Sequence, residues 1–202
     1  MIAVTFLLQS CAKIFYSSDA TPLARAQKVI AIAPPQVAIA ARKNIDGNAL
    51  IEQQKTESVN FQREMYSWML KRKMQGTITI EIQDVETTNA KLANAGFNNG
   101  QLLTPIDMCN ILGVDGIITS NYALSKPMSE GAAIAIALLF DVWGATNEAT
   151  VSLSIHDQSA KKMIWNFDHK LSSSLGSPAR LVDALMRQAS REMPYFTSQN
   201  TY

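Results

Sequence analysis

The chain contains few of the residues from which reactive or metal-binding sites are built. It has two cysteines, Cys11 and Cys109, and two histidines in 202 residues. It contains no Cys-x-x-Cys pair, no His-Glu-x-x-His motif, no glycine-rich phosphate loop and no Gly-x-Ser-x-Gly elbow. These absences argue against the common zinc, nucleotide and serine-hydrolase sites. We therefore predict no catalytic residue, no metal site and no cofactor.

An excess of charge of one sign is also lacking. The chain has 18 basic and 17 acidic residues, and its densest basic stretch is Lys71–Lys73. A nucleic-acid partner would require a basic stripe with interleaved aromatic residues, so that class of partner is excluded. No apolar run approaches the roughly 20 residues of a transmembrane helix. A content of 47% hydrophobic residues fits a globular domain.

The first eleven residues do carry a signal. A short apolar run, Ile2–Leu8, is followed by Gln9, Ser10 and Cys11, the pattern that bacterial signal peptidase reads before lipid is attached to a cysteine. The basic segment that usually precedes such a run is missing, which suggests a start upstream of Met1. We expect a lipoprotein whose mature chain begins at Cys11. The alternative is a buried strand at the start of a soluble domain.

The lipid prediction decides what Cys109 can do. If Cys11 is acylated, Cys109 has no partner within the chain, and its apolar helical context predicts a buried, inert thiol. A Cys11–Cys109 disulfide is the alternative without processing.

Hydrophobic periodicity and turn residues predict a single α/β domain. The apolar run Val29–Ala33 is typical of a buried central strand that Pro34 and Pro35 close. A long helix is expected over 49–75, with a shorter one from Asp84 to about Gly96 and another from Thr104 to Gly113. Further strands are expected at 77–83 and 117–124, then a hairpin of 151–156 and 163–171 with a turn at Asp157–Lys162, then a helix from Ser177 that Pro194 ends.

Residues 131–143 form the most unusual segment. Apolar residues alternate along it, as in a strand, yet intervening alanines favour a helix. Three interpretations stay open, namely a helix buried on the sheet, an interface with a partner or a membrane surface, and a membrane strand. We take the following residues as interface candidates: Ile134, Ile136, Leu138, Phe140 and Trp143.

Two polar patterns have residue types that occur in catalytic or metal sites. Ser159 and Lys162 match the Ser-x-x-Lys spacing, but they lie in an expected hairpin turn and not on one helical turn, so no catalytic role is expected. His156 and His169 lie on the expected hairpin, each beside an aspartate, and could meet across the strands. No third metal ligand is nearby, and we expect both on the wet face of the hairpin.

Three segments together resemble a known family. Leu112–Ser120 is similar to the Gly-Ala-Asp-x-Val-Val-x-Gly segment of the periplasmic α/β domains of CsgG, the TolB amino-terminal domain and LpoB-type lipoproteins. Asp157 and Trp165 keep the spacing of the Asp-Thr-x-Thr-Gly-x-x-x-Trp hairpin of these domains, and Val29–Pro34 resembles their first strand. The resemblance spans roughly residues 28–193. Ser120 and Lys161 replace usual glycines, which puts the turn geometry at Lys161 in question.

The resemblance implies an α/β fold, a mixed sheet of four to five strands with helices packed on it, and action through surfaces. We expect a signal segment at 1–10, a tether at 11–27, the domain at 28–196 with an apolar insertion at 127–147, and a tail at 197–202. The expected protein is a lipid-anchored, non-enzymatic accessory or assembly subunit of an envelope complex. It would lie on the periplasmic face of the outer membrane, with a homo-oligomer left open.

Two other functions are alternatives to the accessory or assembly role. One is a small-ligand-binding domain with its pocket near Pro34 and Asn121. The other is an envelope hydrolase that acts through His156 or His169.

Overall fold

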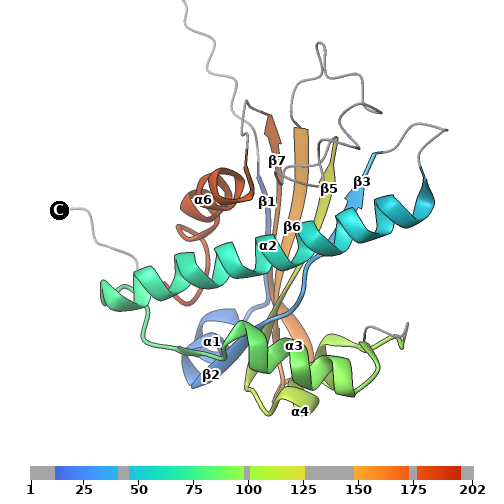
Figure 1. The fold of residues 1–202 in the computed structure, drawn as a ribbon. Coiled ribbons are helices and arrows are strands. Elements are labelled where there is room, and N and C mark those ends of the chain that lie inside the picture. The colour runs from blue at the N-terminus through green and yellow to red at the C-terminus, as the bar shows by residue number, and fades with distance from the viewer. Residues whose placement is uncertain (1–11, 41–45, 98–100, 126–147, 173–176, 197–202) are drawn as a thin grey trace, which may run out of the picture.

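The computed structural model describes residues 12–40, 46–97, 101–125, 148–172 and 177–196. These residues form one mixed sheet of seven strands with five helices packed on it (Figure 1). The strand order is β1-β7-β6-β5-β2-β4, and β3 pairs with β5 beyond β2. The strands are β1 (Lys13–Tyr16), β2 (Val29–Ile32), β3 (Gln36–Ile39), β4 (Glu81–Ile82), β5 (Gly116–Leu124), β6 (Glu148–Asp157) and β7 (Lys162–Ser172). The helices are α1 (Ala20–Ala26), α2 (Gly47–Met74), α3 (Val85–Asn94), α4 (Pro105–Leu112) and α6 (Pro178–Ala189).

The predicted α/β class is confirmed, but the sheet has more strands than the four to five expected. One additional strand follows the two prolines. β2 pairs with β5 up to Ile32 opposite Ile118, and pairing resumes with Gln36 opposite Asn121. Four steps on one strand against three on the other make a bulge of one residue. Pro34 and Pro35 thus interrupt the strand and do not end the pairing.

The second additional strand lies in the segment expected to be a tether. Residues 13–16 pair antiparallel with β7 as strand β1, and residues 20–26 form α1, which buries Ala20 and Ala24. The expected tether at 11–27 is corrected, because most of it is part of the folded domain. Ser17, Ser18 and Asp19 make a short connection between β1 and α1, in which Ser17 Oγ donates to Asp19 Oδ1 at 2.8 Å.

The predicted helices are confirmed, and their ends follow the local rules. Asp84 caps α3 by accepting from the Thr87 amide at 2.7 Å. Thr104 and Asp107 form a reciprocal capping box at the start of α4, and Gly113 ends that helix in the left-handed conformation. By contrast, the strand expected at 77–83 contracts to β4, Glu81–Ile82, although Ile78, Ile80 and Ile82 are all buried as their alternation predicts.

One face of the sheet, called here the covered face, carries the main core. Helices α2 and α6 pack on it and touch each other. In Figure 1 α2 crosses in front of the strands. The Phe61 and Tyr122 rings stack at 4.2 Å between α2 and β5. Strands β6 and β7 add side chains that are at most 1% exposed: Val151, Leu153, Ile155, Trp165 and Phe167.

The opposite face has only a small second core at one end. There α3 and α4 bury Leu92, Met108, Cys109 and Leu112 against Ile117 and the alanines of β2. Cys109 is fully buried as predicted. Burial, followed by the negative charges of Asp157 and Asp115, raises the pKa of its thiol to about 12.

Candidate functional site

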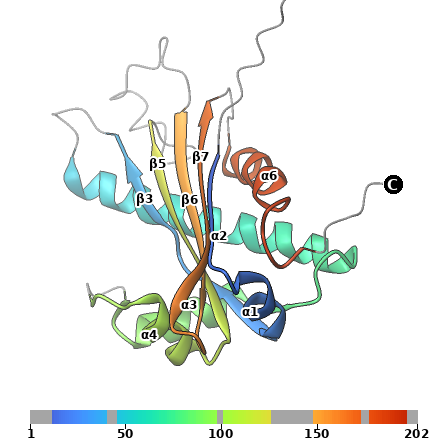
Figure 2. The ribbon, with the colours of Figure 1, turned by 180° about the vertical axis from the view of Figure 1, so that it is seen from behind.

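Beyond the second core, no described helix covers the second face of the sheet. We call this region the open face (Figure 2). Because successive side chains of a strand point to opposite faces, each strand presents on the open face the side chains that lie between its buried ones. The open face is made of Lys13 and Phe15 on β1, Gln36 and Ala38 on β3, Thr119, Asn121 and Ala123 on β5, Thr150, Ser152, Ser154 and His156 on β6, and Asn166, Asp168 and Lys170 on β7.

The polar groups of the open face are joined by hydrogen bonds. Asn166 Nδ2 donates to Ser152 Oγ at 3.0 Å and to Ser154 Oγ at 3.1 Å across the β6–β7 pair. Thr119 Oγ1 and His156 Nε2 lie 3.2 Å apart across β5 and β6. These bonds hold short side chains in fixed positions on a broad surface, an arrangement suited to contact with another molecule.

Strand β1 is an edge strand of the sheet, with Phe15 on the open face and Ile14 and Tyr16 on the side of the covered face. Ile14, Phe15 and Tyr16 are 39%, 48% and 43% exposed. The Tyr16 hydroxyl donates to the Glu192 carbonyl oxygen beside α6, so only its ring is available for contact. Sequence reasoning missed this strand. The signal was present, because Ile14, Phe15 and Tyr16 are strong strand formers.

The two histidines do not come together. His156 lies on the open face, whereas His169 lies on the covered face, is 3% exposed and packs with its ring centre 5.7 Å from that of Phe167. Among the described residues, His169 Nδ1 has no hydrogen-bond partner. Burial lowers the pKa of both imidazoles. The expectation that both occupy the wet face is wrong for His169, because alternation along β7 places it in the same row as Trp165, Phe167 and Leu171, whose side chains are buried.

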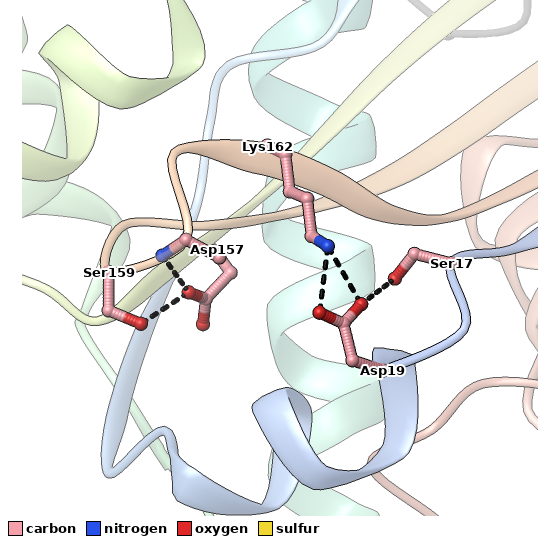
Figure 3. A network of polar contacts seen from close by, with 6 residues as sticks. Ser17, Asp19, Asp157, Ser159 and Lys162 are labelled. Atoms are coloured by element: carbon pink, nitrogen blue, oxygen red, sulfur yellow. Dashed lines mark hydrogen bonds and ion pairs between the residues drawn. The ribbon is translucent and has the colours of Figure 1, made fainter.

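The Ser-x-x-Lys spacing does not bring its two side chains together (Figure 3). Ser159 Oγ donates to Asp157 Oδ1 at 2.7 Å, whereas Lys162 Nζ reaches both carboxylate oxygens of Asp19 at 2.8 Å. Each group is therefore held by a different carboxylate. Across the described ranges, no group of three or more ionisable side chains is placed to hold a metal ion.

Asp157 is the centre of a buried polar network at the β6–β7 turn. It is 2% exposed and accepts from Gln27 Nε2 at 2.7 Å, as well as from Ser159 and from the Ala160 amide. Burial raises the pKa of this carboxyl, but the hydrogen bonds outweigh burial and the net pKa is lowered. The Tyr195 hydroxyl donates to Gln27 Oε1 at 2.6 Å, so the network joins three distant parts of the chain.

The motif residues that carried the family resemblance have structural roles. Asp115 Oδ2 accepts from the Lys28 and Val29 amides at 2.7 and 3.0 Å, which fixes the start of β2. A Cβ at Gly116 would lie 2.3 Å from Gln27 Oε1, so a larger residue there would displace the Gln27 amide from its bonds to Asp157 and Tyr195. Lys161, at the position of the usual glycine, has a φ of 53°, so the turn keeps the left-handed geometry with a lysine in it.

Cavities lie near both residues named for the ligand-binding rival. One of about 550 Å³ lies between α2, α3 and the β2–β3 connection, and apolar side chains dominate its wall: Pro34, Pro35, Val37, Val59, Leu92 and Phe97. Another, of about 370 Å³, lies on the sheet around Asn121, Ser152 and Ala38. The first has the size of a small-molecule site.

The predicted lipidation site and interface candidates lie outside the described residues. These are Cys11, Ile134, Ile136, Leu138, Phe140 and Trp143, together with the apolar insertion at 127–147. In the part of the chain that the structure describes, no helix combines the length and apolarity needed to cross a bilayer.

Comparison with known proteins adds likenesses at the level of structure only. No protein-family model matches the chain, and no curated protein matches it. Solved structures that it resembles include lipoprotein GNA1162 from Neisseria meningitidis, at 12% identity and a TM-score of 0.43, covering 82% of this chain and 96% of that one. The LpoB C-terminal domain from Salmonella enterica has 10% identity and a TM-score of 0.36, and the match covers 75% of this chain and 94% of that one. A PelC dodecamer from Paraburkholderia phytofirmans has 9% identity and a TM-score of 0.38, and the match covers 93% of this chain and 99% of that one.

Proposed function

We propose that this chain is a non-enzymatic accessory or assembly subunit of a bacterial envelope complex, anchored by lipid at Cys11 and acting through protein–protein contacts. The observation that carries the proposal is the open face. On β5, β6 and β7, one row of side chains is buried under α2 and α6, while the next row is polar and has no described helix over it. Non-obligate protein interfaces are about as polar as the rest of a protein surface and are enriched in aromatic residues, and the open face with Phe15 at its edge fits that composition.

The proposal assigns the contact to the open face and to residues 131–143. The candidates in that segment are Ile134, Ile136, Leu138, Phe140 and Trp143. The segment lies in the sequence between Leu124, the last residue of β5, and Glu148, the first residue of β6, and Leu124 pairs with Ala149. The resemblance to CsgG, the TolB domain and LpoB-type lipoproteins implies action through surfaces, which agrees with this role. Membership of that family stays a prediction.

The test is a crosslinking pull-down from native envelopes, extracted in mild detergent and analysed by mass spectrometry. Ser152→Arg places a long charged side chain in the middle of the open face. Ile136→Asp places a negative charge in the apolar segment 131–143. Met74→Arg is the matched control, because Met74 is 89% exposed at the end of α2. The proposal expects one dominant partner that both test variants lose and the control retains.

Two results would contradict the assembly role. Recovery of the chain alone would remove the partner. Loss of thermal stability in Ile136→Asp, measured by circular dichroism, would show that residue 136 belongs to a core.

A second candidate function is supported by the cavity beside Pro34. Its apolar wall and its volume of about 550 Å³ suit a small apolar ligand. A ligand that binds the native state raises the melting temperature by mass action. We expect a rise with an envelope metabolite extract that Val59→Trp, which fills the cavity, abolishes. An unchanged melting temperature in the wild type would exclude this function.

A further inference from the structure

Strand β1 is the terminal strand on its side of the sheet, and all four of its residues are exposed. It pairs with β7 on one side, and no described strand pairs with it on the other. The Ser17 amide donates to the Ile164 carbonyl oxygen at 2.9 Å. Because amide directions alternate along an antiparallel strand, the backbone groups of Ile14 and Tyr16 point away from β7. An apolar edge with unpaired backbone groups is a surface that proteins normally cover or protect with charge.

The position of β1 in the chain indicates what covers it. Only Ala12 separates the proposed lipid-bearing Cys11 from the start of β1 at Lys13. Two residue steps span at most about 7 Å. An acyl chain on Cys11 therefore holds Lys13, the first residue of β1, within about that distance of the anchor, because only Ala12 lies between them in the sequence.

The side chains of β1 match the chemistry of a lipid–water interface. Aromatic residues favour the headgroup level, and lysine reaches the lipid phosphates while its stem stays in the apolar region. Lys13, Ile14 and Phe15 provide one basic, one aliphatic and one aromatic group in succession. A water-exposed role would leave about half of the Phe15 side chain, 48%, in contact with solvent.

We propose that β1 docks edge-on against the headgroup region of the membrane that holds the Cys11 anchor, with Ile14 and Phe15 in the interface and Lys13 at the phosphates. The inference rests on the lipid anchor of the proposed function. It adds an orientation, because the sheet then stands on its β1 edge. The open face rises from the membrane and stays accessible to a protein partner.

The experiment uses the full chain, processed in a Gram-negative host and reconstituted into vesicles of phosphatidylethanolamine and phosphatidylglycerol. Ile14→Cys and Phe15→Cys are each labelled with an environment-sensitive maleimide dye. Cys109 does not compete for the label, since it is fully buried. Met74→Cys and Leu102→Cys serve as controls, because they are 89% and 92% exposed and lie in other elements. Circular dichroism verifies that each variant is folded.

We expect dyes at positions 14 and 15 to be quenched by lipid-borne nitroxide and protected from aqueous iodide, with the opposite result at 74 and 102. Iodide access at 14 and 15 equal to that at the controls would overturn docking. A disulfide-linked dimer of unlabelled Phe15→Cys in vesicles would also overturn it, because a second copy would then occupy the edge. Intact mass separates the two proposals, since a chain without acyl groups refutes the anchor, whereas an acylated chain with exposed dyes refutes only docking.

Discussion

The two faces of the sheet use the same strands in opposite ways. On β6, Val151, Leu153 and Ile155 are fully buried on the covered face, while Ser152 and Ser154 between them lie on the open face and bond to Asn166. The covered face obtains its stability from apolar area removed from water. The open face contributes little apolar burial, and its side chains are available for contact. Stability and interaction are thus separated by the alternation of a single strand.

The largest expected effect breaks the covered face. Leu153 is fully buried in the main core, so Leu153→Ala removes buried area and leaves a cavity. We expect a loss of about 2–5 kcal/mol in the free energy of unfolding. Thr150→Ala, on the open face of the same strand, should cost less than about 1 kcal/mol. Urea denaturation measures both, and similar losses would refute the contrast between the faces.

The next effect concerns the turn that joins strands β6 and β7. Asp157→Ala leaves the donors of Gln27, Ser159 and Ala160 without an acceptor in a buried site. We expect a loss of about 1–3 kcal/mol. The folded pKa of Asp157 is lowered. Its stabilisation is therefore complete above the unfolded pKa, near 3.9, and is lost as the pH falls through the folded value.

Denaturation of the wild type and of Asp157→Asn between pH 2 and pH 7 checks this dependence. The variant should lose less stability on acidification than the wild type. Equal acid sensitivity would show that other carboxylates dominate.

A smaller effect concerns the two histidines, one on each face, because burial lowers the pKa of both. Burial lowers the pKa of His169, so the unfolded chain binds more protons than the folded one below the unfolded pKa, near 6.5. Stability is then complete above pH 6.5 and decreases as the pH falls toward the folded value. His169→Phe, which can pack on Phe167, should remove part of this decrease. Melting temperatures from pH 4.5 to 8 test it. His156→Gln should also remove part of the decrease, because burial lowers the pKa of His156 as well.

The smallest effect is an expected gain. Lys161 has a φ of 53° in the β6–β7 turn, a conformation that costs a non-glycine residue about 1–2 kcal/mol. Lys161→Gly relieves this cost but adds freedom to the unfolded chain. We expect a net gain of about 0.5–1 kcal/mol. Lys161→Ala should give no gain, and an equal gain from both variants would point to the lysine charge.

Several elements were predictable because their signals are local. The caps at Asp84 and Thr104, the stop at Gly113 and the alternation in 151–155 each depend on neighbours a few residues away, and all are confirmed. The face of His169 also follows from a local signal, because alternation places it in one row with the buried Trp165, Phe167 and Leu171. The register shift beside His156 was not predictable, because it depends on pairing with β7. The predicted interface residues lie outside the described part of the chain and remain predictions.

The sequence by itself determined the α/β class, the buried rows and most helix ends, because hydrophobic period and capping chemistry act over a few residues. Only the tertiary structure decided that residues 13–16 form an edge strand, that β3 continues beyond two prolines and that Asp157 meets Gln27 and, through it, Tyr195. Each of these depends on partners far away in the chain. Which row of the hairpin is covered was decided in the same way, by the packing of α2 and α6 on one face of the sheet.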